Sequence, residues 1–448
     1  MAQIQAFQAT RYSDALRADY PALLTPPYDV IDAAYQDDLY SRHAKNLVRV
    51  DFGKQEASDN GSANKYSRAA ETFDQWKLEG TLARDAQPAL YIYEQEFDLP
   101  GRGRCKRRGF FCEVQLEGLE GEIRAHERTF DGPKADRLLL TRATQANLSP
   151  IFCVYEDPEK VSDAVIANAI NGSPDSEFEI DGIIHRLWVV DDADACAGVA
   201  KALADKRLFI ADGHHRYETA VNYRNERREE GPEADGTNAE AANWALMFLA
   251  NTHDEGLEVL PTHRVLSKEL TAGIDLGRVV ETLKENFHIT ELTPGADASA
   301  SAETYLKALA EAGERGASFV LMVHGGPPRL LTLRAEAEVE QLIPNPDIHA
   351  QVKELDVTIV HRHLIERVWL GEGAPEPDHD DILYVKDAGE AVGMIESGEA
   401  EAGFLLNATK IEQVCRIASL GARMPQKSTY FYPKIITGLV IRDMTPGA

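Results

Sequence analysis

The chain has 448 residues, a hydrophobic share of 44%, a charged share of 27% and a formal net charge of −27. This composition predicts a folded protein of two or three domains and excludes a chain that is disordered throughout. The strong negative charge argues against nucleic acid as a partner, because the chain would repel its phosphates.

The hydropathy pattern and the cysteine content indicate the cellular compartment of the protein. No run of 18 apolar residues occurs, and the first residues lack the basic and apolar regions of a secretory signal. The five cysteines are odd in number, and no two are spaced as Cys-x-x-Cys, which argues against a zinc ribbon and a disulfide framework. We therefore expect a cytoplasmic protein with reduced thiols and no membrane partner.

The first 230 residues predict alternating strands and helices. Two prolines mean that residues 26–31 cannot be the interior of a helix, and the turn at 100–103 between two apolar runs indicates a β-hairpin. Residues 122–150 form a long polar stretch, which in a compact protein is more often functional than not. Strands are expected at 89–97, 108–117, 151–155, 183–190 and 207–211, and helices at 33–43, 64–79, 161–170, 193–204 and from the end of the last strand to about 228.

Residues 229–239 are the best linker candidate, because they are acidic, contain Gly and Pro and lack apolar periodicity. They divide the chain into a region at 1–230 and a second α+β region at 238–448, and we expect the loop at 424–434 to return to the cleft of the first. Strands are expected at 244–251, 257–261, 319–324, 330–334, 382–385, 402–406 and 435–441, and helices at 276–286, 302–312, 353–370 and 410–420. The fold class is mixed α/β.

The sharpest local signal follows the apolar strand at 207–211. A glycine permits a tight turn there and a helix begins, whose first N–H groups and positive dipole end favour an anion. An arginine fork suits phosphate oxygens. The residues predicted to bind phosphate are Asp212, Gly213, His214, His215 and Arg216. In the alternative interpretation, Asp212 is a helix N-cap and the histidines are ordinary surface residues.

The polar stretch holds the candidates for acid–base chemistry. His126 and Glu127 do not begin a zinc-protease motif, because its second histidine is replaced by Phe130. Transfer of a phosphoryl group to a hydroxyl needs a carboxylate that orients or deprotonates the acceptor. We assign this role to Glu127, group His126 with it, and take Asp136 as the second choice. The alternative for Glu127 is an ion pair on a loop.

Two cations outside the turn could offset phosphate charge. Lys427 is followed by Ser428 and Thr429, which indicates an anion site, although no Gly-rich P-loop is present. Arg137 is the second such cation, and solvation is its alternative. His361 and His363 are two residues apart and so lie on different faces of a helix, which argues against a shared metal. A divalent ion would instead be Mg²⁺ held by carboxylates and nucleotide phosphates, with Asp29 and Asp212 as possible contributors.

Six separated motifs occur in order: PPYDVI at 26–31, HERTF…PKADR at 126–137, ANLSPIF at 146–152, IADGHHRYETA at 210–220, LPTHRVL at 260–266 and MPQKSTYFYPK at 424–434. In these motifs the chain is similar to the family termed domain of unknown function 1015. The turn from Gly213 to Arg216 also resembles the ParB–sulfiredoxin superfamily, which includes free-serine kinases and whose corresponding turn binds nucleotide phosphates.

The resemblance implies a ParB–sulfiredoxin-like core and a nucleotide-dependent phosphotransferase. It further implies ATP or ADP and Mg²⁺ as cofactors, and a small hydroxyl metabolite as substrate, with L-serine the first guess. Two other classes stay open. One is a nucleotide-binding regulator without turnover, and the other is a phosphohydrolase in which His214 or His215 attacks or activates water. The oligomeric state is not predicted.

Overall fold

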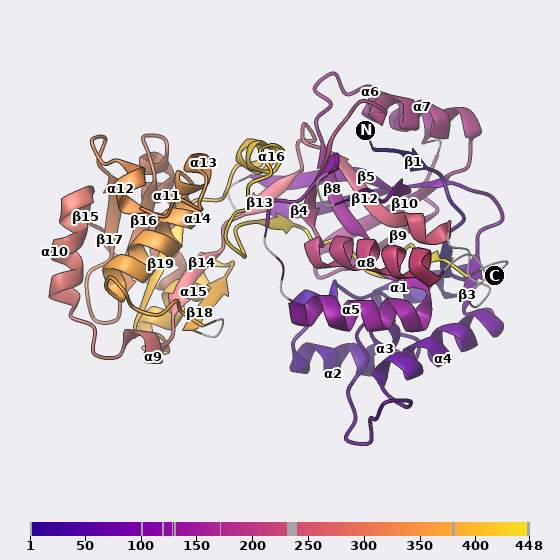
Figure 1. The fold of residues 1–448 in the computed structure, drawn as a ribbon, viewed down its shortest axis with the longest axis horizontal. Coiled ribbons are helices and arrows are strands. Elements are labelled where there is room, and N and C mark those ends of the chain that lie inside the picture. The colour runs from indigo at the N-terminus through magenta and orange to yellow at the C-terminus, as the bar shows by residue number, and fades with distance from the viewer. Residues whose placement is uncertain are drawn as a thin grey trace. The chain divides into compact units, whose positions relative to one another are not determined.

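The structure is a computed structural model that describes residues 2–99, 102–118, 121–127, 129, 131–170, 172–230, 240–378 and 381–445 (Figure 1). The chain divides into two compact units. Unit 1 comprises Met1–Ala125, Thr129–Glu258 and Phe431–Ala448, and unit 2 comprises His126–Arg128 and Val259–Tyr430. Both units combine helices with a β-sheet, which confirms the mixed α/β fold class. No helix in the described ranges is long and apolar enough to cross a membrane.

The boundary between the two units differs from the one that the sequence predicted at residues 230–238. Strand β12 (Trp244–Asn251) pairs with β5 and β8 in the middle of the large sheet, so residues up to Glu258 belong to unit 1. The C-terminal residues return to the same unit, where β21 (Arg442–Asp443) pairs with β7 (Ala146–Asn147). The expected linker at 229–239 lies outside the described residues except for the end of helix α8.

Unit 1 is built on a mixed sheet with the strand order β6-β11-β8-β12-β5-β4-β10-β9, and β1 pairs with β5. The bounds are β1 (Ile4–Gln5), β4 (Leu90–Leu99), β5 (Gly103–Gln115), β6 (Ile123–Arg124), β8 (Ile151–Tyr155), β9 (Ser176–Ile180), β10 (Ile183–Val190) and β11 (Leu208–Asp212). β11 runs parallel to β6 and β12 runs parallel to β8, whereas the other pairs are antiparallel. The predicted hairpin is confirmed, since Leu99 pairs with Gly103.

Helices cover this sheet because each buries one apolar face. Val221 of α8, Leu203 of α7 and Ile166 of α6 join the core cluster of the sheet. Helix α5 packs on α8, and α4 packs on α5 (Figure 1). The helices are η1 (Asp14–Asp19), α1 (Tyr20–Leu23), η2 (Tyr28–Val30), α2 (Ala33–Arg42), α3 (Val48–Asp51), α4 (Lys65–Leu78), α5 (Asp131–Thr144), α6 (Val161–Ala169), α7 (Ala193–Leu203), α8 (His214–Glu230) and η3 (Ala241–Asn243), and a small ribbon joins β2 (Thr10–Tyr12) to β3 (Leu82–Arg84).

Unit 2 is built on an antiparallel sheet with the order β15-β17-β16-β19-β14-β18. Its strands are β14 (His263–Leu266), β15 (Phe287–Glu291), β16 (Ser318–Val323), β17 (Arg329–Leu333), β18 (Ile382–Val385) and β19 (Ala402–Leu406). Its helices are α9 (Lys268–Thr271), α10 (Leu276–Asn286), α11 (Ala298–Gly313), α12 (Val339–Leu342), α13 (Ala350–Lys353), α14 (Asp356–Thr358), η4 (Ile359–Trp369), α15 (Ala388–Glu396) and α16 (Ile411–Ser419). The chain passes between units within β13 (Glu258–Leu260) and β20 (Tyr430–Tyr432).

Two predicted elements are wrong. The single helix expected at 353–370 is divided into α13, α14 and η4, the last a π-helix. Four consecutive β-branched residues at 357–360 weaken an α-helix there. The strand expected at 435–441 is replaced by irregular backbone with isolated bridges at Thr437 and Ile441, because Gly438 has a φ of 91° and interrupts extended pairing.

Candidate functional site

The predicted strand–glycine–helix turn is present in unit 1. Strand β11 ends at Asp212 and α8 begins at His214. Between them Gly213 has a φ of 88°, in the left-handed region that favours glycine. A Cβ at this position would lie 2.9 Å from the guanidinium of Arg216. The glycine is therefore required both by the turn and by the close approach of the arginine.

Asp212 is the centre of a charged network at this turn. One carboxylate oxygen accepts a hydrogen bond from Lys434, and the other accepts one from Arg216, which also donates to the Pro150 carbonyl. Burial acts to raise the pKa of Asp212, but the charges of Lys434 and Arg216 hold it well below its usual range. Two cations thus meet at one carboxylate, and the network keeps an excess positive charge.

The two histidines lie at the first turn of α8. His214 is buried, His215 is half-buried, and the charge of His214 also lowers the pKa of Asp212. Gly213, rather than Asp212, is the residue directly before the helix. Both oxygens of Asp212 face cations, so this carboxylate does not act as a simple N-cap. The first N–H groups of α8 have no acceptor within the helix, as at every helix start.

A cavity of about 40 Å³ lies beside the turn in unit 1. Arg216 and Arg137 both line it, so the structure brings together two of the cations predicted to hold phosphate. Its lining also includes Asp51, Leu140, Thr141, Ala146, Asn147, Leu148, Ser149, Ile151, Thr219, Ala220 and Leu246. Burial raises the pKa of the Asp51 carboxyl, and the positive charges of Arg137 and Arg216 act in the opposite direction. The cavity is polar and large enough for water.

Arg137 is held rigidly at this cavity. Its guanidinium donates to the Asp51 carbonyl at 2.8 Å and to Asp136 at 2.6 and 2.9 Å, and it lies 4.1 Å from the ring centroid of Tyr28. Asp136 also accepts from Lys65 at 2.6 Å and from the Tyr66 hydroxyl at 2.8 Å. Burial opposes the ionised form, yet Arg137 and Lys65 lower the pKa of Asp136. Such an acid is a weak base, so these contacts favour a role for Asp136 in positioning Arg137.

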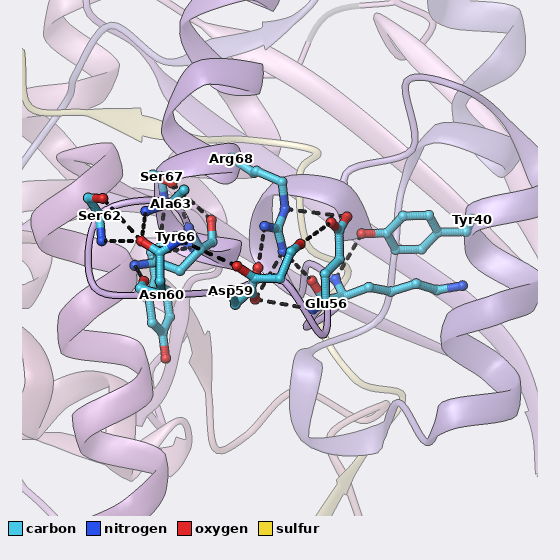
Figure 2. A network of polar contacts seen from close by, with 12 residues as sticks. Tyr40, Glu56, Asp59, Asn60, Ser62, Ala63, Tyr66, Ser67 and Arg68 are labelled. Atoms are coloured by element: carbon cyan, nitrogen blue, oxygen red, sulfur yellow. Dashed lines mark hydrogen bonds and ion pairs between the residues drawn. The ribbon is translucent and has the colours of Figure 1, made fainter.

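The partners of Asp136 are fixed in turn by the loop before α4 (Figure 2). Asn64 and Ser67 form a capping box at the start of this helix. Arg68 binds Asp59, and Asn60 accepts bonds from residues 62 and 63. This polar network holds the first turn of α4, which carries Lys65 and Tyr66.

The other predicted residues belong to unit 2. Oε1 of Glu127 accepts bonds from the backbone N–H groups of Ser428 and Thr429 at 3.1 and 3.3 Å, and from the Thr429 hydroxyl at 3.3 Å. His126 is fully buried, and its Nε2 lies 3.1 Å from the same hydroxyl. Lys427 is exposed, and its carbonyl accepts a bond from Arg264. The structure therefore places Glu127 and His126 at the loop that contains Lys427.

Lys434 is a residue of the site that was not predicted from the sequence. This residue lies in the same MPQKSTYFYPK motif as Lys427, but its segment belongs to unit 1, where it binds Asp212. The only signal was the motif itself, which contains two lysines. The neighbouring hydroxyls favoured the first lysine, and nothing local indicated the second.

Among the described residues, no three His, Cys, Asp or Glu side chains gather in a way that could hold a metal ion. Both carboxylate oxygens of Asp212 are engaged by cations. The residues of the turn therefore do not form a protein-held Mg²⁺ site.

Comparisons with known proteins give a family and several similar structures. The model of the family described as "Protein of unknown function (DUF1015)" matches residues 4–358. No protein among the curated sequences matches the chain. A free serine kinase in complex with AMP is similar in structure at 16% identity and a TM-score of 0.33, covering 74% of this chain and 92% of that one.

Two further structures are similar at the same level. A conserved hypothetical protein from Pyrococcus furiosus has 16% identity and a TM-score of 0.33, with 75% of this chain and 95% of that chain covered. SbnI with a C-terminal truncation, from Staphylococcus aureus, has 10% identity and a TM-score of 0.29, with 72% and 84% covered.

Proposed function

The chain belongs to the DUF1015 family, and from the site in unit 1 we propose that it is a nucleotide-dependent phosphotransferase. The acceptor is the hydroxyl of a small metabolite, with free L-serine as the first candidate. One observation carries the proposal: Arg216 and Lys434 converge on Asp212 where the glycine turn opens α8. The motif resemblance, which implies phosphate binding at this turn, supports the same assignment.

The charges at the turn suit a nucleotide phosphate. Phosphate oxygens take the place of the Asp212 oxygens as acceptors for Arg216 and Lys434, and they also face the first N–H groups of α8. Arg216 is already oriented by the Pro150 carbonyl, so little side-chain freedom is lost on binding. The carboxylate keeps the two cations close together until the phosphate arrives.

The transfer itself moves one phosphoryl group. The acceptor oxygen forms a bond to the terminal phosphorus of ATP or ADP, the bond from that phosphorus to the bridging oxygen breaks, and the shortened nucleotide leaves. The acceptor proton passes to a carboxylate that acts as the general base. Mg²⁺ would be carried in by the nucleotide phosphates, since such ions are commonly bound through phosphates and few carboxylates.

A phosphotransfer screen tests the proposal. The protein is incubated with Mg²⁺, ATP or ADP, and pooled amino acids and sugars, and products are identified by mass spectrometry. We expect one phosphorylated acceptor, and a loss of about tenfold or more in Arg216→Ala, since charged hydrogen bonds contribute about 1.5–3 kcal/mol. The matched control is Arg142→Ala, which removes a half-exposed ion pair with Glu226 and should leave the rate nearly unchanged.

Two other outcomes would contradict the proposal. Release of inorganic phosphate without any phosphorylated acceptor would indicate the phosphohydrolase. Nucleotide binding without turnover would indicate the regulator, and binding would then survive Glu127→Gln.

A further inference from the structure

A buried arginine in the large sheet of unit 1 binds backbone and amide oxygens in place of a carboxylate. Arg107 on β5 is 1% exposed, and its cross-strand partner Gln95 on β4 is 0% exposed. In the described part of the chain, the Arg107 guanidinium donates to carbonyl and amide oxygens and forms no ion pair with a carboxylate. Burying a cation without a carboxylate partner is costly, so an apolar residue would serve a purely structural role better.

Arg107 and Gln95 together bind the backbone carbonyls of residues 432–434. Arg107 donates to the Pro433 carbonyl at 2.5 Å and to the Tyr432 carbonyl at 3.3 Å, and it also binds the Gln95 side-chain oxygen. Gln95 in turn donates from its amide to the Lys434 carbonyl at 2.9 Å. Three consecutive carbonyls of the C-terminal segment are therefore held by two side chains of the sheet.

The held segment carries the cation of the phosphate site. Lys434 extends from it to Asp212, and its side chain is only 12% exposed. Arg107 lies over the rings of Phe152 and Phe248, at 5.0 and 5.9 Å from their centroids, which fixes the guanidinium in one orientation. A shift of its fork would move the Lys434 backbone and, through it, the ammonium group.

We infer that Arg107 and Gln95 are positioning residues that set Lys434 on Asp212 for nucleotide phosphate. This inference rests on the proposed function of the turn. Arg107 does not touch the nucleotide in this account, but acts through the carbonyls of residues 432–434. A lysine cannot replace it, because one ammonium group lacks the planar fork that reaches two carbonyls and an amide at once.

The first test is a double-mutant cycle with ADP binding measured by calorimetry. Arg107→Lys keeps the charge and should weaken ADP binding by about tenfold, as should Lys434→Met. In the Lys434→Met background, Arg107→Lys should add less than about twofold, because the residue acts through the one already removed. Additive losses would overturn the inference. The matched control is Arg108→Lys, at the adjacent half-exposed arginine that binds Glu94, and it should leave ADP binding unchanged.

The second test needs no nucleotide. Acetylation of Lys434 by acetic anhydride, read by peptide mass spectrometry, should rise several-fold in Arg107→Lys and in Gln95→Met, while acetylation of Lys206 stays constant. Gln95→Met conserves volume and removes only the amide, so it guards against a variant that fails to fold. Unchanged acetylation of Lys434 in both variants would overturn the inference. Absence of ADP binding in the unmodified protein would instead contradict the proposed function. The acetylation result would still show whether Arg107 and Gln95 position Lys434.

Discussion

At the scale of single residues, the site is a set of charges that hold one another in place. Asp212 keeps Arg216 and Lys434 together, and Asp136 keeps Arg137 at the neighbouring cavity. Each carboxylate is ionised because its cations outweigh the effect of burial on its pKa. The cations are thereby oriented before a phosphate binds, which reduces the entropy lost on binding.

Replacing Gly213 by alanine should damage the turn in two ways. The left-handed backbone costs an alanine about 1–2 kcal/mol, and the new Cβ would also press on the Arg216 guanidinium. We expect both a lower free energy of unfolding and an ADP affinity reduced by about tenfold. Urea unfolding and calorimetry with ADP measure the two effects.

The Gly172→Ala variant separates the cost of the left-handed backbone from the effect of the new Cβ on Arg216. Gly172 has a φ of 79°, and a Cβ there would meet no atom within 4 Å. It should show the backbone cost and normal ADP binding. Equal ADP affinities for the Gly213→Ala variant and the unmodified protein would show that Arg216 does not need this turn.

The turn could be predicted from the sequence, and its partners could not. Residues 208–216 are contiguous, so an apolar strand, a glycine and a polar helix start identify the turn locally. Lys434 lies 222 residues from Asp212 along the chain, and no periodicity relates the two positions. Glu127 was singled out by residue type, but its contacts with Ser428 and Thr429 depend on a pairing across 301 and 302 residues.

At the scale of elements, strand pairing in the large sheet leaves no room for side chains at particular positions. Gly109 on β5 lies against β12, where a Cβ would come within 2.3 Å of the Leu249 carbonyl and 2.4 Å of the Phe248 ring. The predicted strands at 108–117 and 244–251 were confirmed from their apolar pattern. Their direct pairing was not predictable, because it joins segments that are separated along the chain by more than a hundred residues and by the four helices α5 to α8.

Gly109→Ala should therefore destabilise unit 1. Overpacking of this kind costs about 1–3 kcal/mol, because the obstructing atoms are backbone and a buried ring. Urea unfolding followed by fluorescence of Trp188 and Trp244, which belong to this sheet, measures the change.

The control is Gly132→Ala on α5. A Cβ there meets nothing within 4 Å, so the free energy of unfolding should stay equal or rise by about 0.4–1 kcal/mol. An undiminished stability of Gly109→Ala would mean that β5 and β12 are not packed as described.

At the scale of the whole molecule, the two units should respond differently to acid. Burial lowers the pKa of His263, His361 and His363 in unit 2 to about 4, and that of His185 in unit 1 to about 3. Below about pH 6.5 an unfolded chain binds protons that these folded histidines do not, so stability falls as the pH falls. The loss is up to about 1.4 kcal/mol per pH unit for each histidine.

Burial also raises the pKa of Asp356 in unit 2 to about 7, and this carboxyl offsets the effect of one of the three histidines there. Unit 2 should still lose more stability than unit 1 between about pH 6.5 and pH 4. Trp369 is the tryptophan of unit 2 and reports its unfolding. His363→Phe should reduce the pH dependence of that signal, since His363 is buried and stacks on Phe287. His288→Phe, at an exposed position of the same sheet, is the control and should leave the pH dependence unchanged. A pH-independent Trp369 transition would contradict the account of these histidines.

An isotope-tracing experiment tests directly whether the protein transfers a phosphoryl group to L-serine. The protein is given L-serine with ATP labelled with ¹⁸O in the γ-phosphoryl group, or with ADP labelled in the β-phosphoryl group, and products are read by mass spectrometry. The proposed phosphotransferase should yield O-phosphoserine that carries the intact labelled phosphoryl group, and this product should be lost in Arg216→Ala and Lys434→Met. Labelled inorganic phosphate alone, or equal phosphoserine from those two variants, would contradict the proposal.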